Sequence, residues 1–415
     1  MRAGETFGAA RDRLVEGLDE RDRRLAHELA AGVLRRQHEL DAALDLAHAD
    51  ARLHDVLRLG AYQLQRLSRV PAHAAVSSAV ELARETCGEG AARYVNQALR
   101  RLATAGRREP GDGRGGKSGA TSHPDWLVRR WRQRFGADAT AHLLDWNDTR
   151  PALVIQPVGQ DRVALREQWE AVGIRVEDAP FGAGLRLLPD PRTSRVPRPT
   201  SLPGFAEGAG VVQDSAQALV VHFAAIPAGA RVYDACAAPG GKAVLLEQAG
   251  AKVFAGDASH SRVERLAETI RRCARGVTVL AADLTTPPFA PRSWDAVLVD
   301  APCTATGTMA RHPDARWRIT ERGLDTVVQR QRALFESAAR LVRPGGVLVY
   351  ATCSLEPEEN EQQVDSFLSG HPDFARAPVS GAVPSTLVTT AGDLASLPFR
   401  DGIDGAYAAR LQRRA

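Results

Sequence analysis

From about residue 201 onward, short apolar stretches alternate with longer stretches that have the spacing of amphipathic helices. This alternation constrains the fold strongly, because neighbouring parallel strands need a crossover connection, which is usually a helix. We therefore predict a Rossmann-like α/β domain with a mostly parallel sheet that helices cover on both faces. The predicted strands are 231–235, 252–257, 277–283, 294–300 and 347–352, and the predicted helices lie near 243–249, 260–274, 323–342 and 358–369.

Ligands bind such sheets beyond the carboxyl ends of the strands, and every predicted strand here ends in residues suited to chemistry. A single aspartate at a strand end is as often a loop cap as a ligand contact. Five strands that bring Asp, Gly or Cys to one edge instead indicate a functional rim. In chain order, the rim residues are Cys236, Ala237, Ala238, Pro239, Gly240, Gly241, Lys242, Asp257, Asp283, Asp300, Cys303 and Cys353.

The glycine turn after the first strand indicates the class of ligand. A phosphate-binding Walker loop needs Gly at position 236 and Ser or Thr at 243, where this chain has Cys and Ala, and the dinucleotide fingerprint G-x-G-x-x-G is absent from the turn. Small residues let a ligand approach the backbone closely, and Asp257 is placed to accept both hydroxyls of a ribose. An adenosine ligand without a phosphate cradle indicates S-adenosylmethionine.

Two cysteines on adjacent rim positions, Cys303 and Cys353, indicate the reaction. Carbon 5 of cytosine is a poor nucleophile, and a thiolate that adds to carbon 6 makes carbon 5 able to attack a sulfonium methyl group. The thiolate is the reactive form, so it needs a nearby base or cation. Lys242, one of three lysines in an arginine-rich chain, is the candidate for that electrostatic help.

The first half of the chain predicts binding to a polyanion and no chemistry. Residues 1–105 have apolar residues at helical spacing and predict a helical bundle, 106–122 predict a flexible basic linker, and 123–200 predict a small α/β module. Residues 93–134 hold ten arginines and one lysine against three acidic residues, which suits a polyanion, although a solvated linker is the alternative. Trp126 and Trp131 either stack on bases or pack in the core of the module.

The composition of the chain limits the classes of protein to which it can belong. The chain is 44% hydrophobic and 25% charged, as in globular proteins, and its five cysteines show no C-x-x-C spacing, so we expect reduced thiols and no metal site. No apolar run reaches the roughly 18 residues of a membrane helix, and Glu5, Arg11 and Asp12 interrupt any signal-peptide core. We expect a cytoplasmic monomer that does not bind membranes.

The motifs together resemble the bacterial 16S rRNA cytosine-C5 methyltransferases of the RsmB (Sun/Fmu) type, over nearly the whole chain. Residues 234–242 (Asp-Ala-Cys-Ala-Ala-Pro-Gly-Gly-Lys) are similar to the S-adenosylmethionine loop of that family. Residues 300–314 are similar to its Pro-Cys motif and residues 350–360 to its Thr-Cys motif. Segments 22–25, 57–64, 70–76 and 94–100 resemble the NusB-like RNA-binding domain that is fused to this subgroup.

The resemblance implies a role for each matching residue. The backbone of 236–242 would hold the methionine part of the cofactor, Asp257 the ribose, and Asp283 would lie by the adenine. Asp300 would line the shared pocket and contact the target base. Cys353 would be the nucleophile, and Cys303 would assist release of the adduct, an assignment that the residues alone leave open. Cys236 would be structural although it faces the loop.

Other functions are compatible with parts of the sequence. The same chemistry on tRNA, a non-catalytic NusB-type scaffold, and an oxidoreductase with the two thiols as a redox pair are the alternatives. Intact Cys303 and Cys353 argue against the scaffold, and the missing dinucleotide fingerprint argues against the oxidoreductase. Residues 1–19 are shorter and more glycine-containing than the start of the family's NusB-like domain, which places RNA docking through that end in doubt.

Overall fold

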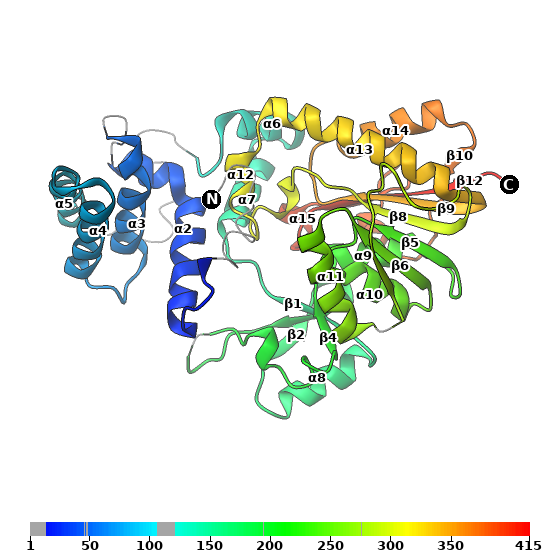
Figure 1. Ribbon diagram of the computed structural model, residues 1–415, viewed down its shortest axis with the longest axis horizontal. Helices are drawn as coiled ribbons and strands as arrows, with labels where there is room; N and C mark the ends of the chain where they lie inside the picture. Colours follow the sequence, from blue (N-terminus) through cyan, green and yellow to red (C-terminus); the bar gives the residue numbers. More distant parts are fainter. Residues whose placement is uncertain (1–13, 45, 47–48, 106–120, 194, 275) are drawn as a thin grey trace. The chain divides into compact units, whose positions relative to one another are not determined.

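The computed structural model of the chain describes residues 14–44, 46, 49–105, 121–193, 195–274 and 276–415 (Figure 1). The chain forms two compact units, Met1–Thr149 with Met309–Arg318, and Arg150–Thr308 with Ile319–Ala415. This division differs from the four predicted segments, whose boundaries at 105, 122 and 200 remain predictions. Residues 1–13 and residues 106–120 of the predicted linker lie outside the described residues.

The first unit is helical, as the spacing of its apolar residues predicts. Leu57 of α3, Ala79 of α4 and Leu99 of α5 are buried in one core. Gly60 allows α3 and α5 to approach, because a Cβ atom there would lie 2.4 Å from Leu99 Cδ1. The elements are α2 (Glu20–Leu44), η2 (Ala51–Leu53), α3 (His54–Arg66), α4 (Ala72–Cys87), α5 (Glu89–Thr104), α6 (Asp125–Phe135), α7 (Ala137–Asp148) and α12 (Ala315–Arg318).

Helix α6 separates its apolar and basic residues. Trp131 is fully buried and makes an edge contact with His123, with ring centroids 5.5 Å apart. Core packing is therefore the right interpretation for this tryptophan. Arg129 and Arg132 are exposed on the same helix.

A buried arginine ties the 309–318 segment to the helices of the first unit. The Arg316 side chain has no exposed surface. Its Nη1 donates to Asp148 Oδ1 at 2.9 Å and to the backbone oxygens of Arg35 and Ser122, and its Nη2 donates to the backbone oxygens of Asn147 and Met309. The planar guanidinium can reach this many acceptors because its donors point outward in a fixed fork.

We predict that Arg316→Met destabilises the protein by about 3–5 kcal/mol, because it removes a buried charge that pairs with Asp148 at 2.9 Å and the donor to four backbone oxygens. Arg316→Lys should recover little of this loss, since one ammonium cannot reach all five acceptors. Urea unfolding followed by circular dichroism measures the effect. The matched control is Arg24→Met, whose side chain is 48% exposed and pairs with Glu20, itself 53% exposed. If Arg316→Met were as stable as this control, the prediction would be contradicted.

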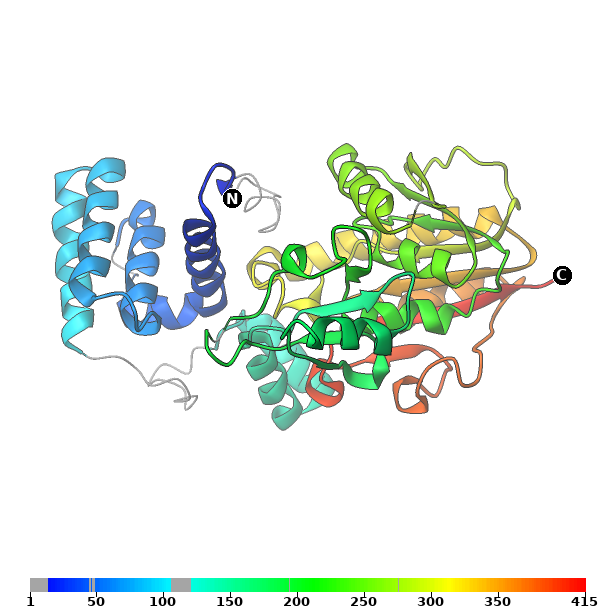
Figure 2. The ribbon, with the colours of Figure 1, turned by 90° about the horizontal axis from the view of Figure 1, so that it is seen from below.

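The second unit begins with a small antiparallel sheet in the order β2-β3-β1-β4 (Figure 2). Ile155, Leu165 and Trp169 form its buried core. Its first three strands lie inside the α/β module predicted at 123–200, and β4 lies beyond the predicted end of that module. The elements are β1 (Val154–Pro157), α8 (Arg162–Glu170), β2 (Val176–Asp178), η3 (Pro180–Gly182), β3 (Leu185–Leu187), η4 (Pro199–Ser201) and β4 (Gly210–Val212).

The large sheet has the order β10-β12-β9-β8-β5-β6-β7, with β11 paired to β12. Strands β7, β6, β5, β8 and β9 are parallel, and β10, β11 and β12 are antiparallel to their partners. This confirms the predicted mostly parallel sheet. The strands are β5 (Arg231–Ala235), β6 (Lys252–Asp257), β7 (Thr278–Ala281), β8 (Trp294–Asp300), β9 (Val342–Thr352), β10 (Phe374–Arg376), β11 (Leu394–Ser396) and β12 (Ala406–Arg413).

Helices cover both faces of this sheet (Figure 1). Alternate residues of each strand enter different cores: Val232 packs with α9, α10 and α11, whereas its neighbour Tyr233 packs with α13 and α14. The remaining elements are α9 (Ser215–Ala224), α10 (Gly241–Gln248), α11 (His260–Cys273), η5 (Thr306–Thr308), α13 (Glu321–Leu341), α14 (Glu361–Gly370), η6 (Ser385–Leu387) and α15 (Pro398–Asp401).

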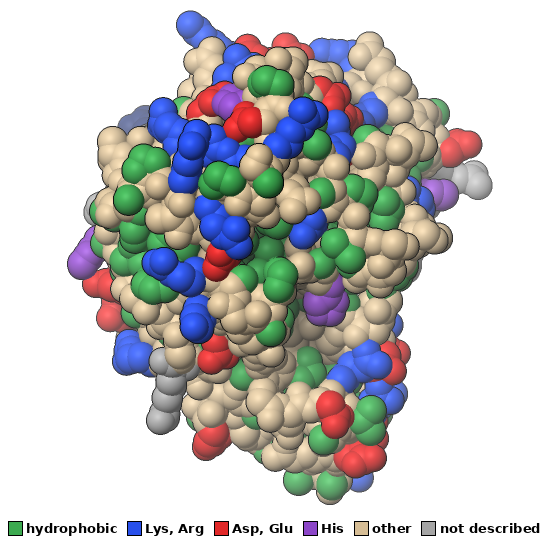
Figure 3. Space-filling view, turned by 90° about the vertical axis from the view of Figure 1, so that its right-hand side faces the viewer, with side chains coloured by type: hydrophobic (Ala, Val, Ile, Leu, Met, Phe, Trp, Pro, Cys, Tyr) green, Lys and Arg blue, Asp and Glu red, His purple; other side chains and the backbone are tan. Residues whose placement is uncertain are grey.

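The surface at the end of the second unit where β5, β6 and β9 begin carries both signs of charge. Figure 3 shows Lys and Arg side chains with acidic ones between them on the face seen from that side. Arg231, Lys252 and Arg343 are exposed there, and Arg343 pairs with Asp295 at 2.5 Å. Within the described residues, no helix combines the length and the apolar character that crossing a bilayer requires.

Candidate active site

The carboxyl ends of β5 and β8 bring acidic residues to the rim. Asp234 and Asp300 follow Val232 and Leu298 at the strand period of two, so they lie on the side of the sheet that α9 and α10 cover. Lys242, in the first turn of α10, reaches this side. Its Nζ donates to Asp300 Oδ2 at 2.7 Å and to Gln217 of α9.

Lys242 and Asp300 form an ion pair on the side of the sheet that α9 and α10 cover. The Lys242 side chain is 8% exposed and that of Asp300 is 31% exposed, so one oxygen of a partly open carboxylate is held by a buried cation. Among the described residues, Lys242 donates to Asp300 and Gln217 and to neither cysteine. Its expected help to the thiolate is therefore not a direct contact.

Asp234 is a second acid beside this pair. Its side chain is fully buried, and among the described residues neither carboxyl oxygen has a hydrogen-bond partner. Burial, together with the negative charge of Asp300, raises the pKa of Asp234 to about 8, although Lys242 opposes the shift. The carboxyl group therefore keeps its proton near neutral pH while the site is without ligand.

The turn after β5 has the backbone shape that its residues predict. Cys236 and Gly240 have positive φ values of 62° and 108°. The φ of 108° favours glycine at position 240, where a Cβ atom would also lie 2.9 Å from the end of the Leu266 side chain. Burial raises the pKa of Cys236 to about 12, which keeps this thiol protonated.

The two other rim aspartates hold turns of their own. Asp257 is buried at the end of β6, where Oδ1 accepts from Ser259 N and Oδ2 pairs with Arg262 at 2.9 Å. Asp283 is exposed and accepts from both the backbone N–H and the hydroxyl of Thr285. Both therefore cap loops, and their predicted contacts to ribose and adenine remain predictions.

The two cysteines of the rim lie in contact. Sγ of Cys303, after β8, is 3.2 Å from Sγ of Cys353, after β9. Both are partly buried and neither is in a disulfide. The hydrogen bond between the sulfurs, burial and the nearby negative charges raise the pKa of the Cys303 thiol well above its ordinary value.

Backbone contacts hold the two cysteine loops together. Gly307 N donates to the backbone oxygen of Cys353 at 2.9 Å. A Cβ atom on Gly307 would lie 2.7 Å from Gly405 Cα and 2.8 Å from that oxygen, so only glycine fits. The Thr308 hydroxyl lies 3.9 Å from Cys353 Sγ.

Two observations support the binding of a cationic adenosine cofactor at the rim. The 236–241 turn is bent by positive φ values and lined by small residues, which leaves the backbone open to close approach. Asp234 has acceptor capacity that no described residue uses, beside a loop that would hold a sulfonium or ammonium group. A bound cation would favour the ionised form of this acid and offset its burial.

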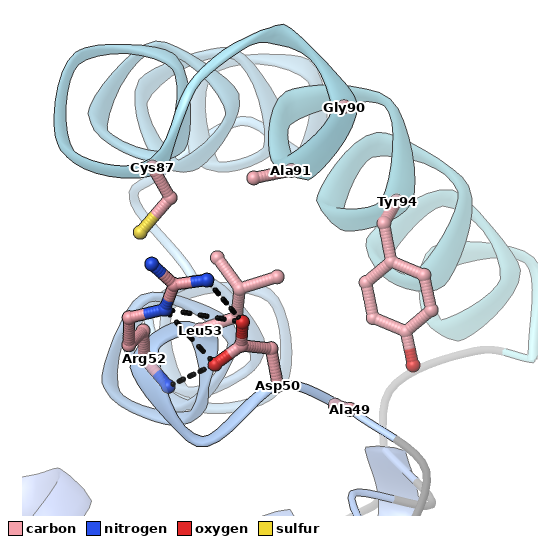
Figure 4. Close-up of a pocket in the computed structure, with 8 residues that line it drawn as sticks. All are labelled: Ala49, Asp50, Arg52, Leu53, Cys87, Gly90, Ala91 and Tyr94. Atoms are coloured by element: carbon pink, nitrogen blue, oxygen red, sulfur yellow. Dashed lines mark hydrogen bonds and ion pairs between the residues drawn. The ribbon is translucent and has the colours of Figure 1, made fainter.

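A separate concave site of about 310 Å³ lies in the helical unit (Figure 4). Arg52 and Asp50 form an ion pair on one side of it, and Cys87 and Tyr94 face them from α4 and α5. It contains none of the predicted rim residues, so it is distinct from the candidate active site.

Several polar residues of the site were not singled out from the sequence. Asp234 and Glu359 are inside the quoted motifs, but no role was assigned to them. Gln217 and Gln331 belong to helices whose amphipathic pattern does not show that a glutamine faces the rim. An acid within an otherwise apolar strand, as at position 234, is the one signal that sequence reasoning had available.

Comparisons with known proteins agree with this geometry. A model of the family described as 16S rRNA methyltransferase RsmB/F matches residues 224–412, and a NusB family model matches residues 4–104. A "Probable ribosomal RNA small subunit methyltransferase B" from Synechocystis sp. is 35% identical, covering 94% of this chain and 91% of the relative. "Ribosomal RNA small subunit methyltransferase B" from Pasteurella multocida is 34% identical, covering 87% and 80%.

Solved structures share the fold. The crystal structure of PH0851 has a TM-score of 0.79 at 25% identity and covers 97% of this chain and 92% of its own. That of NSun6 from Pyrococcus horikoshii has a TM-score of 0.60 at 19% identity and covers 70% and 98%.

The fold and the rim define an S-adenosylmethionine-dependent RNA methyltransferase. The chain belongs to the RsmB/F family of 16S rRNA methyltransferases and carries a NusB-family domain at its N-terminus. The predicted family, fold class, enzyme class and cofactor are thereby confirmed.

We predict that Asp234 makes stability fall as pH rises. The folded carboxyl group titrates at about pH 8 and the unfolded one near its ordinary value of 3.8, so folding takes up a proton between these values. The contribution is complete below about pH 4 and lost by about pH 8, on the order of a few kcal/mol. Asp234→Asn should remove this dependence.

Urea unfolding of ligand-free protein at several pH values between these limits tests this. The control is Asp365→Asn, whose side chain is 64% exposed and should leave the profile unchanged. Parallel profiles for wild type and Asp234→Asn would contradict the prediction.

Proposed function

We propose that this protein transfers a methyl group to carbon 5 of a cytosine in 16S rRNA, through a covalent bond between Cys353 Sγ and carbon 6. The observation that carries the proposal is the 3.2 Å contact between Cys303 and Cys353 on the rim. Cys303 comes three residues after Asp300, whose carboxylate accepts from the buried Lys242. The match to the NusB family favours ribosomal RNA over tRNA.

S-adenosylmethionine supplies a methyl group on a positively charged sulfur. The backbone of 236–242 would hold its methionine part, with Asp234 providing the negative charge. Asp257 would bind the ribose hydroxyls by sharing its carboxylate with Ser259 and Arg262, and Asp283 would border the adenine. The Lys242–Asp300 pair would lie between cofactor and base, where the second Asp300 oxygen can accept a hydrogen bond from the cytosine.

Cys353 acts as a thiolate that forms the sulfur–carbon 6 bond, and the electron pair of the carbon 5–carbon 6 double bond becomes available at carbon 5. Carbon 5 forms its bond to the methyl carbon as the methyl–sulfur bond breaks, and that bond's electrons remain on the donor sulfur. A base then removes the carbon 5 proton. The double bond re-forms and expels the Cys353 thiolate, a step in which Cys303 assists.

We expect Cys353→Ala to abolish methyl transfer while the affinity for S-adenosylmethionine stays within about three-fold, because only the nucleophile is removed. Cys303→Ala should let an RNA–protein adduct accumulate, seen as a slow gel band that survives denaturant. Radiolabelled methyl transfer to unmodified 16S rRNA and the gel assay measure both. Turnover by Cys353→Ala would move the nucleophile elsewhere, and the absence of the band would remove the release role of Cys303.

The target base must leave its stack before a cysteine can reach it, so the substrate is a loop or a flipped nucleotide. Contacts with the RNA backbone would come in part from the basic residues of 93–134. On α6, Arg129 and Arg132 are exposed and available for phosphates. We place the reaction in the cytoplasm, on a monomeric enzyme.

We predict that Arg129→Gln with Arg132→Gln weakens RNA binding and lowers the slope of log affinity against log salt by about one to two, because each lost phosphate contact releases fewer counterions. Filter binding to 16S rRNA at several salt concentrations measures the slope. Arg166→Gln, a change on α8 where Arg166 pairs with Asp178, serves as the control. An unchanged slope in the double variant would return α6 to the role of a solvated helix.

A further inference from the structure

Glu359 is a buried acid that the chemistry above does not use. Its side chain lies in the segment between Cys353 and α14 and is fully buried. Oε2 accepts from Thr304 N at 2.9 Å and from Gln331 Nε2 at 2.8 Å, and Oε1 accepts from the hydroxyls of Thr304 and Ser354. All four contacts are hydrogen-bond donors, and none is a cation.

Three of these four donors belong to the two cysteine loops. Thr304 directly follows Cys303, and Ser354 directly follows Cys353. Gln331 of α13 also donates to the backbone oxygen of Pro302, directly before Cys303, at 3.0 Å. One carboxylate therefore joins the residues next to both sulfurs.

The directions of the surrounding hydrogen bonds suit an ionised Glu359. Ser354 Oγ accepts from Glu356 N at 3.0 Å and lies 3.2 Å from the Thr306 hydroxyl. The Thr306 oxygen itself accepts from Leu355 N at 2.8 Å. Thr304 N and Gln331 Nε2 can only donate, so Oε2 of Glu359 accepts from both, and the Ser354 hydroxyl, which also lies 3.1 Å from that of Thr304, donates to Oε1. Burial raises the pKa of Glu359, and the four donors oppose that shift.

The Glu359 carboxylate is held mainly on the Cys303 side of the pair, because two of its four hydrogen bonds come from Thr304 and a third from Gln331, which also binds Pro302. Two sulfurs 3.2 Å apart repel each other strongly if both are thiolates, so one proton is shared between them or stays on one. Glu359 disfavours a negative charge on Cys303. Tyr350 is also beside Cys303 and Glu359, and its hydroxyl donates to the backbone oxygen of Glu359 at 2.8 Å. Tyr350 is neutral, because burial raises its pKa well above the ordinary value.

We propose that Glu359 is a positioning residue for the cysteine pair: its carboxylate joins the two loops and keeps the proton on Cys303, so that Cys353 is the sulfur that attacks as a thiolate. The inference rests on the proposed function, in which Cys353 is the nucleophile. It adds a physical reason for the difference between two cysteines that share one rim. The Cys303 thiol can then donate its hydrogen to the Cys353 sulfur across their contact.

The test compares the reactivity of the two thiols in the full chain without RNA or cofactor. Each cysteine is alkylated with iodoacetamide over a range of pH, and mass spectrometry of the peptides gives a rate for each site. In the wild type, Cys353 should react about ten-fold faster than Cys303 near neutral pH, because iodoacetamide attacks thiolates. In Glu359→Gln the ratio should fall to about three-fold or less, because the amide carries no charge.

The matched control is Glu336→Gln, the same chemical change on α13 at a side chain that is 42% exposed and pairs with His371. It should keep the wild-type ratio. Glu359→Asp retains the charge and should give an intermediate ratio, which loss of packing alone would not produce. Equal rates in the wild type, or an unchanged ratio in Glu359→Gln, would overturn the proposal. The comparison of the two cysteines in the wild type needs no variant. Equal rates there would therefore overturn the proposal even if Glu359→Gln does not fold.

Kinetics separate this inference from the proposed function. Glu359→Gln should lower kcat at least about ten-fold and shift its pH profile, with KM for RNA within about three-fold, since the Glu359 side chain is fully buried. If Cys353→Ala still transfers methyl groups, the proposed function fails whatever the alkylation rates are. If Cys353→Ala is inactive and Glu359→Gln keeps the wild-type alkylation ratio, the role of Glu359 alone fails.

Discussion

The parallel pairing of β8 with β9 is the constraint on which the site depends. Its register places Asp300 opposite Ala351, so the chain leaves the two strands at the same level of the sheet. Cys303 and Cys353 each follow within three residues of those positions, and their sulfurs meet 3.2 Å apart. A shift of the register by one residue would turn every side chain of one strand to the opposite face and separate the sulfurs.

The polar groups under this contact explain why the loops hold their geometry. A buried carboxylate without its hydrogen bonds would destabilise the fold, whereas one that accepts from four donors rigidifies what surrounds it. Glu359 meets this condition through Thr304, Ser354 and Gln331. Asp234 is the opposite case, because its oxygens have no described partner and its carboxyl group remains protonated. Glu359 therefore stabilises the loops around it, whereas Asp234 is available to a cationic ligand.

The segment after Cys303 has a further role in the chain's organisation. After Thr308 the chain contributes residues 309–318 to the helical unit and returns to the second unit at Ile319. Arg316 fastens that segment through its ion pair with Asp148 and four backbone oxygens. The loop of Cys303 is thus continuous in sequence with a part of the unit that contains the NusB-family region.

The amino-acid sequence by itself determined the parallel strands, the rim and the family. The runs at 231–235, 252–257 and 294–300 match β5, β6 and β8 residue for residue, because buried parallel strands are nearly continuous in apolar residues. Tertiary structure alone decided β12, whose Ala-Tyr-Ala-Ala-Arg-Leu-Gln-Arg sequence is rich in helix formers and becomes a strand by pairing with β9. It also decided the partners of Lys242 and Glu359, because hydrogen bonds between residues 25 to 58 positions apart depend on how strands and helices pack and leave no periodic signal in the chain.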